Sequence, residues 1–352
     1  MTVNRRTVTL IIIVVIVVGG VYGITVWQRA RETRQMLSDL MSRDHGVATK
    51  AMTGLRDRTS AVSEDLISFL DRGHDDVRWR AAMLLGTVNT RASREALTDA
   101  LRDPSPEVRL NAALSLGHLG ARKQAGRIAT LAGDADEPVA VRTAAVRALE
   151  LLRAGDHMEA LVQIAEDRPP VPEPAEEAEE AAAAEETPAA DETAEAEEPQ
   201  EEEEEEPVDE TQPLREEAVR ALGRITPVGP PAAQEEGSGA ETSPALLAAD
   251  VLRDSVDPEL EPSDAVRQAA CYGLGDLATA TVDDETRARV VQALIFALDD
   301  EIGDVRIAAA HSLRLLQPPP ELADQVRSAF RRAADDSHYW VRQAAEEAVE
   351  GG

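Results

Sequence analysis

The chain has 352 residues and a formal net charge of −31, with 43% apolar but only 3% aromatic residues. Twenty acidic residues and no basic residue lie between Pro169 and Pro213, so the remainder of the chain carries only −11. This acidic balance repels phosphate backbones and argues against general nucleic-acid binding. Cys271 is the only cysteine, which excludes an intramolecular disulfide and a thiolate metal cluster. Outside the N-terminal region the composition is dominated by strong helix formers and predicts an all-α protein.

The N-terminal region is strongly apolar. No charged residue occurs from Thr7 to Trp27, and a run of Leu, Ile and Val extends from Leu10 to Val18. About twenty such residues in a helix match the roughly 30 Å hydrocarbon core of a bilayer. We therefore expect a transmembrane helix over residues 7–27 and a single-pass location in the cell membrane.

A cleaved signal peptide is the alternative for this region, but the small-residue site that cleavage needs is poor here. Arginines before and after the apolar run are nearly balanced. The side of the membrane that holds the rest of the chain therefore stays open, and the signal-like start favours the outer face.

A ten-residue frame, Val-Arg-x-x-Ala-small-x-x-Leu-Gly, recurs along the rest of the chain. It begins at seven positions: Val77, Val108, Val141, Leu214, Val266, Val305 and Val341. Frame positions 1, 5 and 9 are apolar and four residues apart, which places them on one face of a helix. Acidic residues stand just ahead of most frames, where they can cap the helix.

A second helical segment precedes each frame, so that each repeat is a helical hairpin. These first helices are predicted at 64–70, 94–102, 123–132, 158–166, 244–253, 285–298 and 321–333. One hairpin cannot bury its apolar face alone, so the hairpins are expected to stack on one another. The sequence therefore predicts a right-handed α-solenoid of about seven hairpins.

The Asp-x-x-x-x-Val-Arg-x-x-Ala-Ala-x-x-Leu-Gly strings resemble the HEAT-repeat family of the short, phycobilisome-lyase-like type. They are clearest over 103–117 and 300–313, and the resemblance covers about residues 60–349 with gaps. It implies that the frame arginines form a structural ladder between adjacent repeats, and not a catalytic site. These are Arg78, Arg109, Arg142, Arg215, Arg267, Arg306 and Arg342.

Two segments interrupt the repeats. The acidic stretch 169–213 falls between the two helices of the fourth hairpin and is expected to be disordered, because Pro, Ala and Glu bury too little surface. The expected organisation is a tail (1–6), a transmembrane helix (7–27), a juxtamembrane helical segment (28–59), repeats (60–168), the acidic insertion (169–213), the second helix of repeat four (214–225), a flexible loop (226–243) and further repeats (244–352).

No arrangement typical of catalysis, cofactor binding or metal binding occurs among the histidines, glycines and the cysteine. Frame positions 3 and 7 lie opposite the apolar stripe, and we name their candidate binding residues the column. The column comprises Trp79, Met83, Leu110, Leu114, Arg147, Arg220, Tyr272, Ile307 and His311. Exposed aromatic and aliphatic residues among arginines are typical of protein-binding surfaces, although Trp79, Leu110 and Leu114 could instead pack against neighbouring helices.

The predicted function is a membrane-anchored HEAT-like scaffold that binds a protein or peptide through its concave face. It is expected to be neither an enzyme nor a cofactor carrier. Two alternatives stay open: a lyase-like or chaperone role in attaching a chromophore to a protein, and a cell-envelope structural element whose acidic loop binds cations or basic partners.

Overall fold

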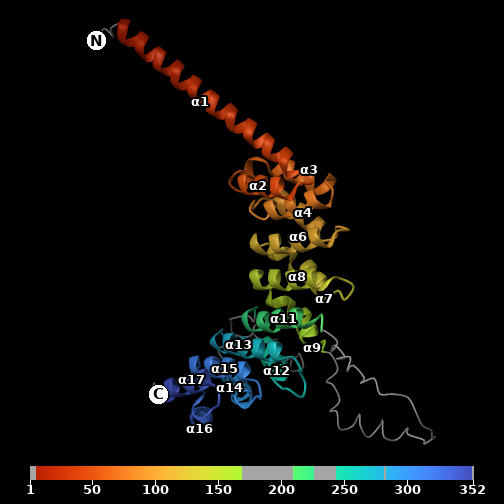
Figure 1. Ribbon diagram of the computed structural model, residues 1–352, viewed down its shortest axis with the longest axis vertical. Helices are drawn as coiled ribbons and strands as arrows, with labels where there is room; N and C mark the ends of the chain where they lie inside the picture. The colour runs from red at the N-terminus through yellow and green to blue at the C-terminus, as the bar shows by residue number, and fades with distance from the viewer. Residues whose placement is uncertain (1–4, 169–208, 226–242, 281–282, 351–352) are drawn as a thin grey trace, which may run out of the picture. The chain divides into compact units, whose positions relative to one another are not determined.

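All regular elements in the described part of the chain are helices. The computed structural model describes the backbone of residues 5–168, 209–225, 243–280 and 283–350, and the side chains from residue 21 to residue 349 within these ranges. No strand occurs there. The all-α prediction is therefore confirmed, and the chain forms two compact units, Met1–Leu152 (unit 1) and Arg153–Gly352 (unit 2) (Figure 1).

Unit 1 begins with a long helix, α1 (Arg5–Leu40), followed by α2 (His45–Leu55) and the 3-10 helix η1 (Arg56–Ala61). Three hairpins follow: α3 (Ser63–Arg72) with α4 (Asp75–Leu85), α5 (Arg91–Ala100) with α6 (Pro106–His118), and α7 (Ala125–Gly133) with α8 (Val139–Leu152). A short 3-10 turn, η2 (Arg122–Gln124), leads into α7.

Unit 2 contains four hairpins. Each pairs a first helix with a frame-bearing second helix: α9 (Met158–Glu166) with α11 (Gln212–Ile225), α12 (Pro244–Asp254) with α13 (Asp264–Ala280), α14 (Asp284–Ala297) with α15 (Gly303–Leu315), and α16 (Ala323–Ala333) with α17 (Tyr339–Glu350). The 3-10 turns η3 (Gly155–His157) and η4 (Pro320–Leu322) precede α9 and α16. All fourteen predicted hairpin helices are present, each within a few residues of its predicted bounds.

The apolar stripe of the frame forms the core of each unit. The residue at frame position 5 is alanine in every repeat and is fully buried in all seven, from Ala81 to Ala345. Position 1 is at most 1% exposed throughout, and position 9 is equally buried except at Val349 in the last helix, which is 46% exposed. The period of four residues that predicted the helices is therefore also the period of burial.

Within each unit the second helices pack directly on one another, α4–α6–α8 in unit 1 and α11–α13–α15–α17 in unit 2 (Figure 1). Small frame residues allow this close approach. A Cβ atom at Gly117 would lie 2.9 Å from Ala148 Cα, and one at Gly223 would overlap the Gly273 carbonyl group. First helices contact one another less extensively than second helices do.

Two arginines fasten helix α1, Arg80 from the first hairpin and Arg58 from η1. Arg80, which is 1% exposed, donates from Nη1 to the carbonyl oxygens of Leu40 and Ser42, both at 3.1 Å. Arg58 donates to Thr33 Oγ1 at 3.0 Å and pairs with Glu32 at 3.3 Å. Because carbonyl groups at a helix end lack helical partners, Arg80 supplies the C-terminal cap of α1.

The expected membrane location is contradicted. Among the described residues no helix is both long enough and apolar enough to cross a membrane. The predicted transmembrane helix over residues 7–27 is therefore unsupported; the side chains of residues 7–20 lie outside the described part of the chain. In the described remainder of α1, Arg29, Arg31 and Glu32 follow Trp27 closely and leave no room for about twenty continuous apolar residues.

The predicted acidic insertion (169–213) and flexible loop (226–243) lie outside the described residues, except at their ends. Asp209 to Pro213, assigned to the insertion from the sequence, are described, and α11 already begins at Gln212. The reason is local: Asp209 Oδ1 accepts hydrogen bonds from Thr211 N at 2.9 Å and Thr211 Oγ1 at 2.7 Å. These bonds fix the turn into the helix.

Candidate functional site

The frame arginines bridge neighbouring hairpins through carboxylates. Arg78 donates from Nε and Nη2 to the two carboxylate oxygens of Asp103 at 2.8 and 2.7 Å. Arg306 binds Asp336 in the same bidentate way at 2.8 and 3.0 Å. The other bridging pairs are Arg109–Glu137, Arg215–Glu261 and Arg267–Asp300. Each acid lies in the turn of the following repeat, so each pair ties two hairpins together.

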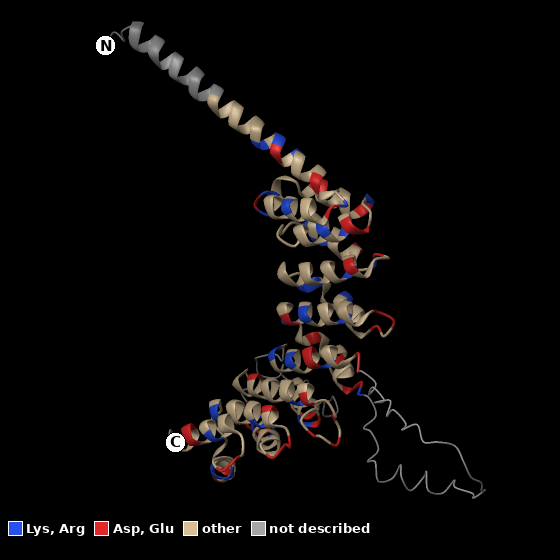
Figure 2. Cartoon of the chain, in the orientation of Figure 1, with Lys and Arg blue, Asp and Glu red and all other residues tan. Residues whose placement is uncertain are grey.

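The turn in which each acid lies is also held by the acid itself and by the frame arginine of its own repeat. Asp300 accepts the Ile302 N–H at 2.8 Å, while its carbonyl oxygen accepts from Arg306 Nη1 at 2.8 Å. Asp336 repeats this arrangement with the His338 N–H at 2.6 Å and Arg342 Nη1 at 2.7 Å. Acidic residues accordingly gather at the turns into the second helices, as Figure 2 shows for the turn between α7 and α8. The pairs organise turns and hairpin spacing together.

Two frame arginines donate to carbonyl groups instead of a neighbouring repeat's carboxylate. Arg142 donates from Nε to the Ala132 carbonyl oxygen at 3.0 Å, and Arg342 binds the Asp336 and Ser337 carbonyl oxygens at 2.7 and 2.8 Å. Arg342 belongs to the last hairpin. All seven frame arginines thus donate hydrogen bonds inside the array, a geometry suited to a structural role.

Sequence reasoning missed three of the acids involved: Glu137, Asp209 and Glu261. Asp209 and Glu261 each stand six residues before a frame arginine, as Asp103, Asp300 and Asp336 do. This constant spacing of six residues could have identified Asp209 and Glu261 from the sequence. Glu137 stands only five residues before Arg142, so its pairing with Arg109 depends on the shape of the turn and is not visible in the spacing.

The column residues lie on consecutive second helices but differ in exposure. Met83 and Tyr272 are 44% and 38% exposed, and Arg147 and His311 are exposed as well. The remaining five are half-buried: Trp79, Leu110, Leu114, Arg220 and Ile307. The structure therefore places all nine on second helices and leaves Met83 and Tyr272 as the exposed apolar members.

Two column residues are held by their own helices. The Arg80 guanidinium carbon lies 5.3 Å from the centre of the Trp79 ring, so the ring covers this buried cation. Arg220 pairs with Glu216 at 3.3 Å and with Glu217 at 3.9 Å. Trp79 and Arg220 are thus less available to a partner than the sequence predicts.

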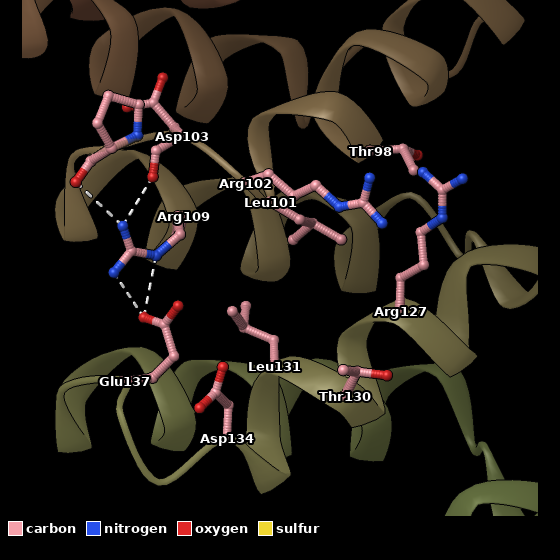
Figure 3. A pocket seen from close by; sticks show the side chains of 11 residues that line it. Thr98, Leu101, Arg102, Asp103, Arg109, Arg127, Thr130, Leu131, Asp134 and Glu137 are labelled. Carbon is pink, nitrogen blue, oxygen red and sulfur yellow. Dashed lines mark hydrogen bonds and ion pairs between the residues drawn. The ribbon is translucent and has the colours of Figure 1, made fainter.

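A hollow of about 480 Å³ opens between the second and third hairpins. Its floor contains Leu101 and Leu131, and the Arg109–Glu137 pair forms one end (Figure 3). Arg102, from the turn after α5, and Arg127, from α7, bring their guanidinium groups to the opposite end, beside Thr98 (Figure 3). The size lies in the range of ligand pockets.

The titratable groups give no sign of a nucleophile or a metal centre in the described residues. Burial raises the pKa of the Cys271 thiol, which is fully buried and stays protonated at neutral pH. Within the described ranges, no three or more His, Cys, Asp or Glu side chains are arranged to hold a metal ion.

Sequence comparison agrees with this architecture. The profile of HEAT repeats matches residues 63–150 and 258–350, just over half of the chain. No curated protein matches the sequence.

Several solved structures are similar. An engineered protein is 17% identical, with 90% of this chain and 77% of that chain covered and a TM-score of 0.46. The CpcE–CpcF complex of phycocyanin lyase from Nostoc sp. PCC7120 is 18% identical (81% and 94% covered, TM-score 0.37). Human deoxyhypusine hydroxylase with glycerol is 20% identical (84% and 98% covered, TM-score 0.29). These are distant likenesses, and they carry no statement about activity.

Proposed function

The chain belongs to the HEAT-repeat family, and we propose that it binds a protein or peptide through the column residues on the second helices of each unit. The observation that carries the proposal is the exposure of Met83 and Tyr272 on helices whose other apolar frame positions are buried or, at Trp79, half-buried. Large flexible and aromatic side chains supply most of the energy at protein interfaces. The proposed role is binding, without catalysis.

The packing of the two helix layers supports the choice of face. Second helices approach one another through glycine and alanine contacts, whereas first helices contact one another less. A stack of hairpins curves towards its more closely spaced layer, and we therefore expect the column on the inner side of each unit. Solenoid repeat proteins use such concave surfaces for binding.

The test is affinity capture with the full chain in which Met83 and Tyr272 are both replaced by glutamate. Both side chains are exposed, so the array is expected to fold, which circular dichroism and urea unfolding check. Captured proteins that bind the unaltered chain should be lost.

The matched control replaces Leu247 and Phe296, which are 37% and 52% exposed on the first helices α12 and α14, by glutamate. This control adds the same charge on the other layer and should retain the captured proteins. Equal retention by the Met83/Tyr272 variant and the control would overturn the proposal.

A further inference from the structure

We propose that the hollow between the second and third hairpins binds an acidic peptide segment of a partner protein, with Arg102 and Arg127 as the carboxylate-binding groups. This inference rests on the proposed function, because it names a class of partner for the array. It concerns a different surface, since the hollow lies between α5, α7 and their turns and contains no column residue.

The two guanidinium groups arise from neighbouring hairpins and lie at the same end of the hollow (Figure 3). Both side chains are exposed, and within the described residues neither forms an ion pair. Among the described residues, the three carboxylates in the lining of this hollow form no ion pair with Arg102 or Arg127, while Glu95 and Asp99 line a neighbouring hollow beside Arg127.

The acids that line the hollow are at its other end or already engaged. Asp103 accepts two hydrogen bonds from Arg78, and Glu137 Oε2 accepts two from Arg109 at 2.9 and 2.6 Å. Asp134 accepts the Asp136 N–H at 3.0 Å and lies on the Glu137 side in Figure 3. None of these carboxylates neutralises the Arg102–Arg127 end.

The chemistry of the lining defines the occupant. Guanidinium groups bind carboxylates through two parallel hydrogen bonds, which gives both charge and shape selection. Leu101 and Leu131, 5% and 7% exposed, offer an apolar floor next to the cations. A glutamate beside a leucine in an extended segment therefore satisfies both parts of the hollow.

A neighbouring hollow of mixed charge adjoins the Arg127 end. It shares Thr98 and Arg127 with the first hollow and adds Lys123, together with Glu95 and Asp99. Glu95 is held by Arg91 at 2.6 Å on the same helix. Lys123 is therefore placed to bind a second carboxylate of the peptide. Asp99, in the same lining, carries a negative charge that weakens this second contact.

The test measures binding of a short fluorescent peptide, Glu-Leu-Glu between glycine and serine residues, to the full chain by anisotropy. Replacing Arg102 and Arg127 by glutamine should weaken binding at least about tenfold, as expected for losing two charge-assisted hydrogen-bond pairs. A peptide with Gln-Leu-Gln should bind the unaltered chain at least about tenfold more weakly.

Two controls show whether the peptide binds at Arg102 and Arg127 specifically or responds only to the net charge of the chain. Replacing Arg122 and Arg331 by glutamine removes the same charge at exposed positions outside the hollow and should leave the affinity unchanged. Replacing Arg102 and Arg127 by glutamate should transfer binding to a Lys-Leu-Lys peptide. Equal weakening by the control pair, or equal affinity for both peptides, would overturn the proposal.

The Met83/Tyr272 double-glutamate variant distinguishes this proposal from the function on which it rests. If that variant loses its captured proteins but still binds the acidic peptide, both proposals are supported. If it keeps them while the peptide binding depends on Arg102 and Arg127, only the column proposal fails.

Discussion

Arg215 and Glu261 form an ion pair from which water is excluded: Nη1 donates to Oε2 at 2.6 Å, and the side chains are 1% and 0% exposed. The pair joins the fourth and fifth hairpins. Glu261 Oε1 also accepts the Ser263 N–H at 3.0 Å, while Arg215 Nε is buried without a hydrogen-bond partner. The pair therefore has a short direct hydrogen bond, but one N–H of Arg215 is buried without an acceptor.

Replacing Glu261 by alanine is expected to destabilise the array by about 3 kcal/mol, the low end for breaking a buried ion pair, because Asp209 still pairs with the Arg215 guanidinium. The double replacement Arg215→Met with Glu261→Leu should recover part of this loss, since two apolar residues of similar size need no desolvation of charge, while Asp209, 23% exposed, loses its arginine partner. Urea unfolding followed by circular dichroism gives both free energies. A double variant less stable than Glu261→Ala would contradict this account.

Stability should fall in acid partly because of Asp336. Burial alone would raise the pKa of Asp336, but hydrogen bonds from Arg306 and the His338 N–H outweigh it, so its pKa in the folded chain is lowered. Such a group contributes stability that is fully present above its unfolded pKa of about 3.9 and is lost as the pH falls towards the folded pKa.

The variant Asp336→Asn should therefore be less stable than the unaltered chain at neutral pH, and the difference should shrink between about pH 5 and pH 3. Urea midpoints measured across this range provide the comparison. Asp304→Asn, at an exposed position on the adjacent α15, is a control that should show no such convergence. Parallel curves for Asp336→Asn and the unaltered chain would rule out this contribution.

Arg80 is expected to control how firmly α1 is held. Arg80→Met keeps an apolar side chain beneath Trp79 but removes the donor to the Leu40 and Ser42 carbonyl groups. The end of α1 should lose about 2 kcal/mol of local stability, which corresponds to roughly 30-fold faster amide exchange.

Hydrogen–deuterium exchange over residues 36–42 measures this effect. The control Arg91→Met removes an arginine that is 87% exposed and pairs only along its own helix with Glu95. It should leave exchange in this segment unchanged. Unchanged exchange in Arg80→Met as well would show that packing of α1 and α2 suffices.

Much of the architecture was predictable because one local pattern determines both helix and burial. The frame alanines and leucines repeat every four residues, so the same positions indicate the helical face and the core. Asp103, Asp300 and Asp336 could be associated with the frame arginines because each occupies a fixed place before its helix.

Other features depend on contacts that a local pattern does not contain. Arg80 occupies a frame position that is polar or small elsewhere, and only the end of α1 gives it buried partners. Trp79 is half-buried because it covers Arg80. The hollow at Arg102 and Arg127 is formed by the turns and first helices of two hairpins. It cannot be predicted from the sequence of either hairpin alone. The apolar N-terminal run predicted a membrane span that the described helices do not support.

The residues that flank the 169–208 segment share one polar cluster in unit 2. Arg168, just before it, lies 3.9 Å from Glu261 and donates to Ser255 Oγ at 3.4 Å. Asp209, just after it, pairs with Arg215, which binds the same Glu261. The residues before and after the segment are thus held by the same buried ion pair. We therefore expect the sequence between them to be replaceable without disturbing the surrounding helices of unit 2. A fluorescent reporter domain inserted between Arg168 and Asp209 would then report the location of the protein and leave the rest of unit 2 intact.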